Sequence, residues 1–175
     1  MGLQLFLFCG IMVQTSYAML IYSTNGNPTV KKKRVPNMTK HTLVCDDLSI
    51  SFEVEVFEGD IALPTNTILY ISVESCGFAG NASLDIDIKE FSKFCTDLSK
   101  LYETLSGDAM IQEPFGYGQY IKFTATGLGH ILISGMIRGV SEFRHELKFE
   151  NVIDQTFLRK FSRELTEGYS SYSRV

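Results

Sequence analysis

Few residues of this 175-residue chain have side chains that could carry out catalysis. Its three histidines, His41, His130 and His145, are candidates for a general base, because an imidazole titrates near neutral pH. Asp85 and Asp87 alternate with apolar residues, a spacing that resembles paired carboxylates sharing acid–base work. Whether these five residues do chemistry depends on the elements that position them.

Structural roles account for the same five residues more simply. His41 precedes the predicted fold, His130 begins a strand beside a glycine turn, and His145 falls on the apolar phase of a strand. We expect Asp85 to face solvent from a strand and Asp87 to cap a helix. The chain has no GxSxG, HExxH, Walker or dinucleotide-binding motif, so we expect no enzymatic activity. The alternative is an enzyme that uses His130 or His145 with a nearby acid in a concave pocket.

The cysteines, at positions 9, 45, 76 and 95, contain no CxxC pair and have no histidine at ligand spacing. We therefore expect no metal site, no redox motif and no cofactor. Cys95 lies on the apolar stripe of a predicted helix, where it is most simply a small core residue.

The charge of the chain is unevenly distributed. Residues 1–40 contain five basic residues and no acidic one, which leaves 11 basic and 20 acidic residues, a net charge of -9, in residues 41–175. An acidic body repels phosphates and argues against a nucleic-acid partner. It suits a basic protein partner, although solubility alone also accounts for it.

Three glutamates are the candidate residues of a partner-binding surface. Glu53 and Glu55 lie on the polar phase of one predicted strand, and Glu74 lies on the polar phase of the next. Neighbouring strands would place all three on one exposed face of a sheet. Like charges side by side cost stability, so a chain that retains them can be using them to bind a basic partner. The alternative is an ordinary solvated sheet face.

The central element that must position these residues is an amphipathic helix predicted over residues 87–107. Apolar residues recur at steps of three and four, and charged residues take the opposite face. Asp87 suits its N-cap, Glu90 completes a capping-box-like pair, and Gly107 suits the left-handed residue after its end. Asp154 can cap a second helix over residues 155–167, which Gly168 would end before a frayed polar tail.

Alternating apolar and polar residues predict strands around these helices. The first three cover residues 49–57, 67–75 and 78–86, and those after the first helix cover residues 108–113, 119–126, 130–138 and 143–150. Gly135 inside one of them suggests a bulge or a close backbone approach. The order βββαββββα, without an internal repeat, predicts an α+β fold. We expect one antiparallel sheet of about six to seven strands with both helices on one face.

Residues 1–40 are predicted to be an extension of a single α+β domain that covers residues 41–175. The apolar run at residues 3–13 and the small residues at 16–18 resemble a secretory signal with cleavage after Ala18, but no basic residue precedes the run. The run is too short to span a bilayer. Met19 and Met38 are alternative starts, and a start at Met38 would remove a dispensable extension. The protein is expected to be cytoplasmic, or exported if residues 1–18 are a cleaved signal.

Several short segments of the body resemble a known family. They are Glu58-Gly59-Asp60, Cys76-Gly77-Phe78-Ala79-Gly80, the capped helix, Gly127-Leu128-Gly129-His130-Ile131 and Asp154-Gln155-Thr156. This series resembles bacterial WapI-type immunity proteins and related uncharacterised families over residues 48–168. The resemblance implies a cytoplasmic, non-enzymatic protein that binds and neutralises a cognate toxin. It carries over no catalytic residue.

Overall fold

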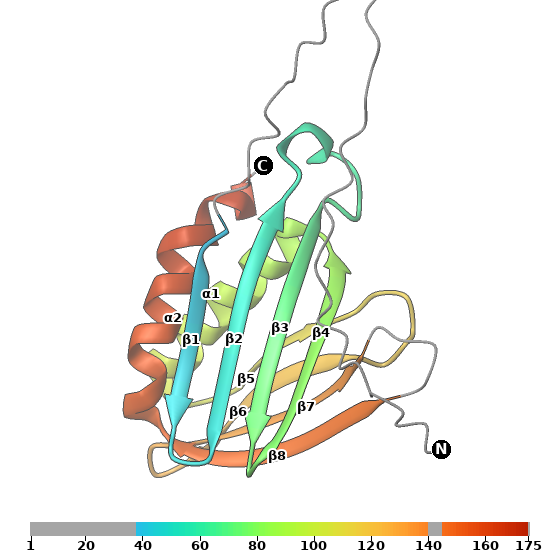
Figure 1. Ribbon diagram of the computed structural model, residues 1–175. Coiled ribbons are helices and arrows are strands. Elements are labelled where there is room, and N and C mark those ends of the chain that lie inside the picture. Colours follow the sequence, from blue (N-terminus) through green and yellow to red (C-terminus); the bar gives the residue numbers. More distant parts are fainter. Residues whose placement is uncertain (1–37, 140–144, 175) are drawn as a thin grey trace, which may run out of the picture. The chain divides into compact units, whose positions relative to one another are not determined.

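The computed structural model describes residues 38–139 and 145–174, and the signal-like segment lies outside these residues. The first four strands are β1 (Lys40–Cys45), β2 (Leu48–Val56), β3 (Thr67–Ser75) and β4 (Phe78–Ile86). Helix α1 (Ile88–Thr104) follows, and then β5 (Asp108–Gln112), β6 (Tyr120–Gly127), β7 (His130–Arg138) and β8 (Glu146–Asp154). Helix α2 (Gln155–Tyr169) comes last, with short 3-10 helices at Glu58–Asp60 and Ser170–Arg174 (Figure 1).

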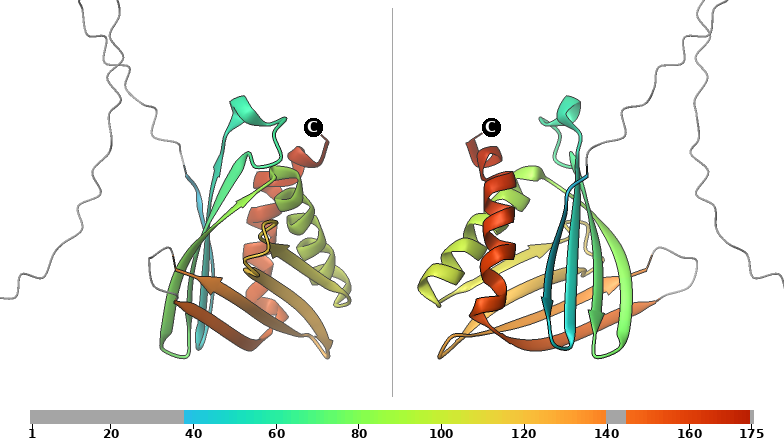
Figure 2. Two further views of the ribbon diagram at one scale, coloured as in Figure 1. Left: turned by 90° about the vertical axis from the view of Figure 1, so that its right-hand side faces the viewer. Right: turned by 60° about the vertical axis from the view of Figure 1, so that its left-hand side comes forward.

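The fold is α+β, but the strands form two sheets instead of one. Sheet 1 has the order β1-β2-β3-β4 and sheet 2 the order β5-β6-β7-β8, and all neighbouring strands in both are antiparallel. Figure 2 shows both helices in the angle between the two sheets. The prediction of one sheet is therefore wrong. Alternation shows only that each strand has one buried face, and this pattern is the same whether seven strands share a sheet or divide into two.

Strand β1 was not predicted, and it changes the interpretation of His41. Residues His41, Leu43 and Cys45 alternate inward and are buried, and a two-residue turn at Asp46-Asp47 joins β1 to β2. A strand of six residues with only three inward positions gives too short an alternation to stand out from a loop. His41 is therefore part of the fold and does not precede it.

Both helices begin at the predicted caps, but neither ends at the predicted residue. The carboxylate of Asp87 accepts a hydrogen bond from the Lys89 amide, and that of Asp154 accepts one from the Thr156 amide, each at 2.8 Å. Helix α1 ends at Thr104, and Leu105 after it adopts the left-handed conformation with φ of 52°. Gly107 also has the predicted left-handed φ, at 83°, but it lies two residues beyond this cap. Helix α2 continues through Gly168 to Tyr169, and the predicted frayed tail is largely a 3-10 helix.

The start of α1 is tied to the β2–β3 loop by Asn66, whose role was not predicted. Its side chain is fully buried. The side-chain oxygen accepts from the Ile88 amide at 2.8 Å, and the side-chain amide donates to the Leu63 carbonyl at 2.8 Å. One residue thus satisfies a free amide of the first helical turn and fixes the adjoining loop.

Strand β8 ends four residues beyond the predicted end of this strand. It runs from Glu146 to Asp154, whereas residues 143–150 were predicted, and part of that range lies outside the described residues. His145 precedes the strand and is exposed, so the prediction that it shares an apolar strand face is wrong. Phe149 does face inward and is buried.

Phenylalanine rings join the two sheets and the two helices in one core. Phe52 of β2 lies 6.1 Å from Phe94 of α1 and 5.4 Å from Phe161 of α2, measured between ring centroids. Phe123 of β6 lies 6.0 Å from Phe94 and 6.4 Å from Phe161. Each pair falls within the range of favourable aromatic contacts. The two sheets therefore share a single hydrophobic core.

The topology repeats, although the sequence shows no internal repeat. Each half is a four-stranded meander followed by a helix whose N-cap is an aspartate at the end of the last strand: Asp87 directly follows β4, and Asp154 is the last residue of β8. Seven residues after each cap stands a core phenylalanine, Phe94 or Phe161. The helices pack reciprocally, because α1 contacts β5 of the second half and α2 contacts β1 of the first.

Candidate functional site

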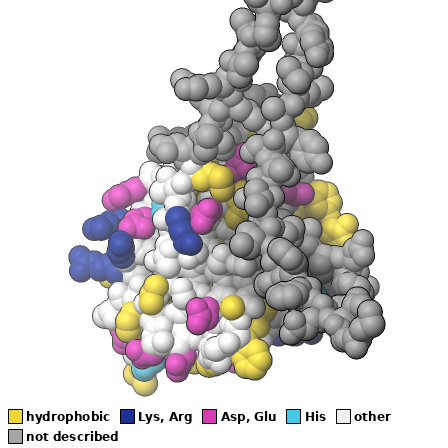
Figure 3. Space-filling view, in the orientation of Figure 1, with side chains coloured by type: hydrophobic (Ala, Val, Ile, Leu, Met, Phe, Trp, Pro, Cys, Tyr) yellow, Lys and Arg dark blue, Asp and Glu magenta, His cyan; other side chains and the backbone are white. Residues whose placement is uncertain are grey.

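The face of sheet 1 that points away from the helices carries all three predicted glutamates. Helices and core side chains cover the other face, and within the described residues no helix or strand covers this one. We call it the outer face of sheet 1, and it consists of Lys40, Thr42, Val44, Ser49, Ser51, Glu53, Glu55, Ile68, Tyr70, Ser72, Glu74, Ala79, Asn81, Ser83 and Asp85. In Figure 3, which views this side, the visible acidic side chains lie apart from one another and are interspersed with hydrophobic and basic ones.

Two of the three glutamates have partners on the same face. Glu53 stands opposite Lys40, and its carboxylate lies 3.5 Å from the lysine ammonium. Glu55 accepts a hydrogen bond from the Tyr70 hydroxyl at 3.1 Å. Partial burial, and then this hydrogen bond, raise the pKa of Tyr70, with a smaller contribution from Asp85.

Glu74 lies at the other end of the face. It stands opposite Ser49, whereas Glu53 stands opposite Tyr70, so four residues of β2 separate the two positions. At a rise of about 3.4 Å per residue this separation is about 13 Å. The structure thus brings the predicted residues onto one face but not into one cluster. Charge there is spread out and partly neutralised.

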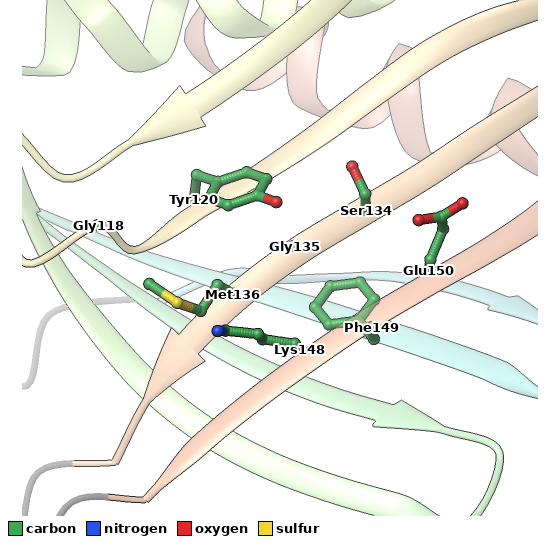
Figure 4. Close-up of a pocket in the computed structure, with 8 residues that line it drawn as sticks. All are labelled: Gly118, Tyr120, Ser134, Gly135, Met136, Lys148, Phe149 and Glu150. Carbon is green, nitrogen blue, oxygen red and sulfur yellow. The ribbon is translucent and has the colours of Figure 1, made fainter.

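A second candidate surface is a hollow of about 590 Å³ on sheet 2. Its lining residues come from the β5–β6 loop and from β6, β7 and β8: Gly118, Tyr120, Ser134, Gly135, Met136, Lys148, Phe149 and Glu150 (Figure 4). They offer an aromatic ring, a thioether, an ammonium group and a carboxylate. This set suits contact with another molecule's surface, and it contains none of the five residues first considered for chemistry.

Gly135 forms the floor of this hollow. A Cβ atom at this position would lie 2.6 Å from the Phe149 ring and 2.9 Å from the Tyr120 carbonyl oxygen. The predicted close backbone approach is therefore confirmed. The side chain missing at Gly135 would point to the buried face of sheet 2, where the Phe149 ring takes its place, so Gly135 contributes only backbone to the hollow on the opposite face.

The loop between β5 and β6 presents two exposed aromatic residues beside this hollow. The buried carboxylate of Glu113 accepts hydrogen bonds from the backbone amides of Phe115 and of Tyr117, the latter at 2.8 Å. Both aromatic side chains are more than half exposed, at 57% and 60%. A loop held by internal hydrogen bonds loses little entropy when it binds, which makes these rings plausible contact residues. A single Glu in a loop gives no sequence signal of this role.

The histidines do not gather into a catalytic arrangement. His41 is buried, with Nε2 3.3 Å from the Tyr169 hydroxyl and Nδ1 3.5 Å from a Glu164 carboxylate oxygen. His41 Nδ1 is close enough to Glu164 for an ion pair with a protonated ring, but the two groups form no hydrogen bond. Burial raises the pKa of Tyr169 to about 12. His130 and His145 are exposed at β7 and before β8.

A hollow of about 340 Å³ lies beside His41. The lining includes Glu55, Tyr169 and Tyr172. The Tyr172 hydroxyl donates to Glu58 at 2.7 Å, and this bond is the main cause that raises its pKa. The histidine is therefore part of a polar contact between β1 and α2.

Asp85, Asp87 and Cys95, which were considered from the sequence, lie where their predicted structural roles place them. Asp85 is exposed on β4 and Asp87 caps α1, as predicted. Cys95 is fully buried in α1, also as predicted, and burial raises the pKa of its thiol. Among residues 38–139 and 145–174, no three His, Cys, Asp or Glu side chains gather closely enough to hold a metal ion. In the same part of the chain no helix is long and apolar enough to cross a membrane.

No model of a known protein family matches the chain, and no curated protein matches it significantly.

Proposed function

We propose that this chain is a non-catalytic module that binds another protein through the outer face of sheet 1. The observation that carries the proposal is the asymmetry of sheet 1. One face is covered by the two helices and by strands β7 and β8 of sheet 2, and the other presents short polar side chains and exposed acids. Short side chains make a flat surface, which suits contact with a folded partner better than the enclosure of a small molecule.

The partner we propose is basic. The body of the chain is acidic, and Glu74 and Asp85 are exposed on this face. Complementary charge speeds encounter and disfavours wrong partners. The narrower proposal, which rests on the resemblance to WapI-type proteins, is that the partner is a bacterial toxin domain and that binding neutralises it.

The test is a triple charge reversal of Glu53, Glu55 and Glu74 to Lys in the full chain. We expect the variant to fold and to lose at least about tenfold in affinity for the partner, because attraction becomes repulsion at an interface where charge sets specificity. The partner is first captured from lysate of the source organism at low and moderate salt, and its affinity is then measured by calorimetry.

The matched control reverses three exposed glutamates on the helices, Glu90, Glu103 and Glu167, which changes the net charge equally at other places. Equal losses in both variants would show a nonspecific charge effect, and unchanged affinity in the sheet variant would show that this face does not bind. Either result rejects the proposed surface.

An exported binding domain is the second candidate, because residues 3–18 resemble a secretory signal. Intact-mass analysis of the protein from its natural host separates the candidates, since cleavage after Ala18 and a start at Met38 give different masses. Cleavage after Ala18 would reject a toxin neutralised inside the cell.

A further inference from the structure

Strand β8 is an open edge of sheet 2. The other edge strand of that sheet, β5, packs against α1, and β1 of sheet 1 packs against α2. Strand β8 contacts α2 and β4, the remaining edge strand of sheet 1. Within the described residues no backbone hydrogen bond joins the outer edge of β8 to another element. An edge of nine residues with free amides and carbonyls is a template for another strand.

The backbone pairing shows which residues of β8 face this edge. The Gly139 amide donates to the His145 carbonyl at 3.0 Å, and the Gln155 amide donates to the Gly129 carbonyl at 2.9 Å. Hydrogen-bonded pairs alternate along an antiparallel ladder, so the odd-numbered residues of β8 bond to β7. The even-numbered residues therefore turn their backbone groups to the open edge: Glu146, Lys148, Glu150 and Val152.

The side chains at this edge are complementary to a second copy of themselves. When two β8 strands run antiparallel with Phe149 at the two-fold axis, Lys148 of each copy stands opposite Glu150 of the other. Glu146 then stands opposite Val152. Moving the two-fold axis from residue 149 to residue 148, a register shift of two residues, places Lys148 opposite itself. Moving it to residue 150 places Glu150 opposite itself, and like charges disfavour both registers.

Asn151 on the inward side of β8 accepts a hydrogen bond from the Ser75 hydroxyl at 2.8 Å, whereas the side chains of Lys148 and Glu150 stand on the opposite side of the strand. Glu146 is held 3.0 Å from the Arg138 guanidinium, and it lies only at the limit of an ion pair with Lys148, at 4.0 Å. The Lys148 side chain is 72% exposed. Glu150 is exposed as well, and both residues border the hollow of sheet 2.

We propose that the chain forms a symmetric homodimer through its β8 edges, with Lys148 and Glu150 paired across the two-fold axis. The two copies of sheet 2 then form one continuous eight-stranded sheet, because each is four strands wide and they join edge to edge. The surface lies on sheet 2, apart from the outer face of sheet 1, so each copy can still bind a partner there.

Sedimentation equilibrium and light scattering on the full chain test the dimer. We expect twice the mass of one chain for the wild type. Lys148→Glu and Glu150→Lys are each expected to weaken self-association at least about tenfold, because each creates two repulsive pairs across the axis. Lys89→Glu, an exposed reversal on α1, is the control and is expected to leave the dimer intact.

A mixture of the two single variants is the decisive measurement. The Lys148→Glu chain has glutamate at positions 148 and 150, and the Glu150→Lys chain has lysine at both. Opposite charges therefore face each other across a mixed dimer, and we expect the two variants, each monomeric alone, to form a heterodimer. The doubly exchanged chain, Lys148→Glu with Glu150→Lys, is expected to dimerise again. A monomeric wild type, single variants that dimerise like the wild type, or a mixture that stays monomeric would each overturn the proposal. Circular dichroism of every variant verifies folding.

Discussion

Gly135 shows how one residue shapes the packing on the buried face of sheet 2. Its backbone passes so close to the Phe149 ring and the Tyr120 carbonyl that no side chain fits. The sequence suggested a bulge or a close approach at this glycine, and the structure has the close approach. The alternation of apolar residues placed Phe149 on an apolar strand face but could not reveal that its ring fills this space, because alternation does not give the register that sets Phe149 opposite Gly135.

We predict that Gly135→Ala destabilises the protein by about 1–3 kcal/mol, because the added methyl group overlaps the Phe149 ring and the Tyr120 carbonyl oxygen. The free energy of unfolding in urea measures the effect. The control is Gly59→Ala, where a Cβ atom would meet nothing within 4 Å. Equal stability of the two variants would contradict the crowding at Gly135.

At the scale of the elements, local signals predicted both helices and most strands. The N-caps Asp87 and Asp154 were identified because an aspartate before an amphipathic run has one clear use. The helix ends were missed because Leu105 adopts a left-handed conformation that leucine rarely takes, and because Gly168 stays helical. Strand β1 was missed because its alternation is too short to stand out and because its packing against α2 is a tertiary contact that no local pattern shows.

Asn66 stabilises the junction between the β2–β3 loop and α1 through a contact 22 residues away in sequence. We predict that Asn66→Ala lowers the free energy of unfolding by about 1–3 kcal/mol, because the Ile88 amide is left buried without an acceptor. Chemical denaturation measures this change. Asn81→Ala, on the exposed side of β4, is the control, and a loss of the same size there would contradict the assigned role.

For the candidate site, the sequence predicted the shared face but not its charge arrangement. Period-two alternation placed Glu53, Glu55 and Glu74 on one side of two neighbouring strands, and they do lie on one side. The pairing of Glu53 with Lys40 depends on β1, which was not predicted. The hollow of sheet 2 and the Glu113 loop depend on contacts between strands and within a loop, for which sequence spacing carries no signal.

At the scale of the whole molecule, the shared phenylalanine core makes the two halves interdependent. Phe123 of sheet 2 reaches both helices, and Phe52 of sheet 1 reaches the same two rings on them. Neither half can bury its helix without the other, because α1 packs on β5 and α2 packs on β1.

We therefore predict a single unfolding transition in urea, with coincident curves from far-ultraviolet circular dichroism and tyrosine fluorescence. Phe123→Ala is expected to lower the free energy of unfolding of the whole domain by about 3–5 kcal/mol, because it opens a cavity between both halves. The single transition then moves to a lower urea concentration. Phe78→Ala, at a side chain that is 71% exposed, is the control. Two separate transitions, or the loss of one half alone, would contradict a common core.

The reciprocal packing also has a consequence for the synthesis of the chain. Strand β1 is made before the other described elements, yet the Tyr169 hydroxyl that meets His41 is made 128 residues later. At elongation rates of about 5–20 residues per second, β1 therefore waits at least about six seconds for α2. During that interval the nascent sheet exposes an apolar flank next to an unpaired strand, the kind of surface that chaperones recognise. The fold is closed only when its last helix leaves the ribosome.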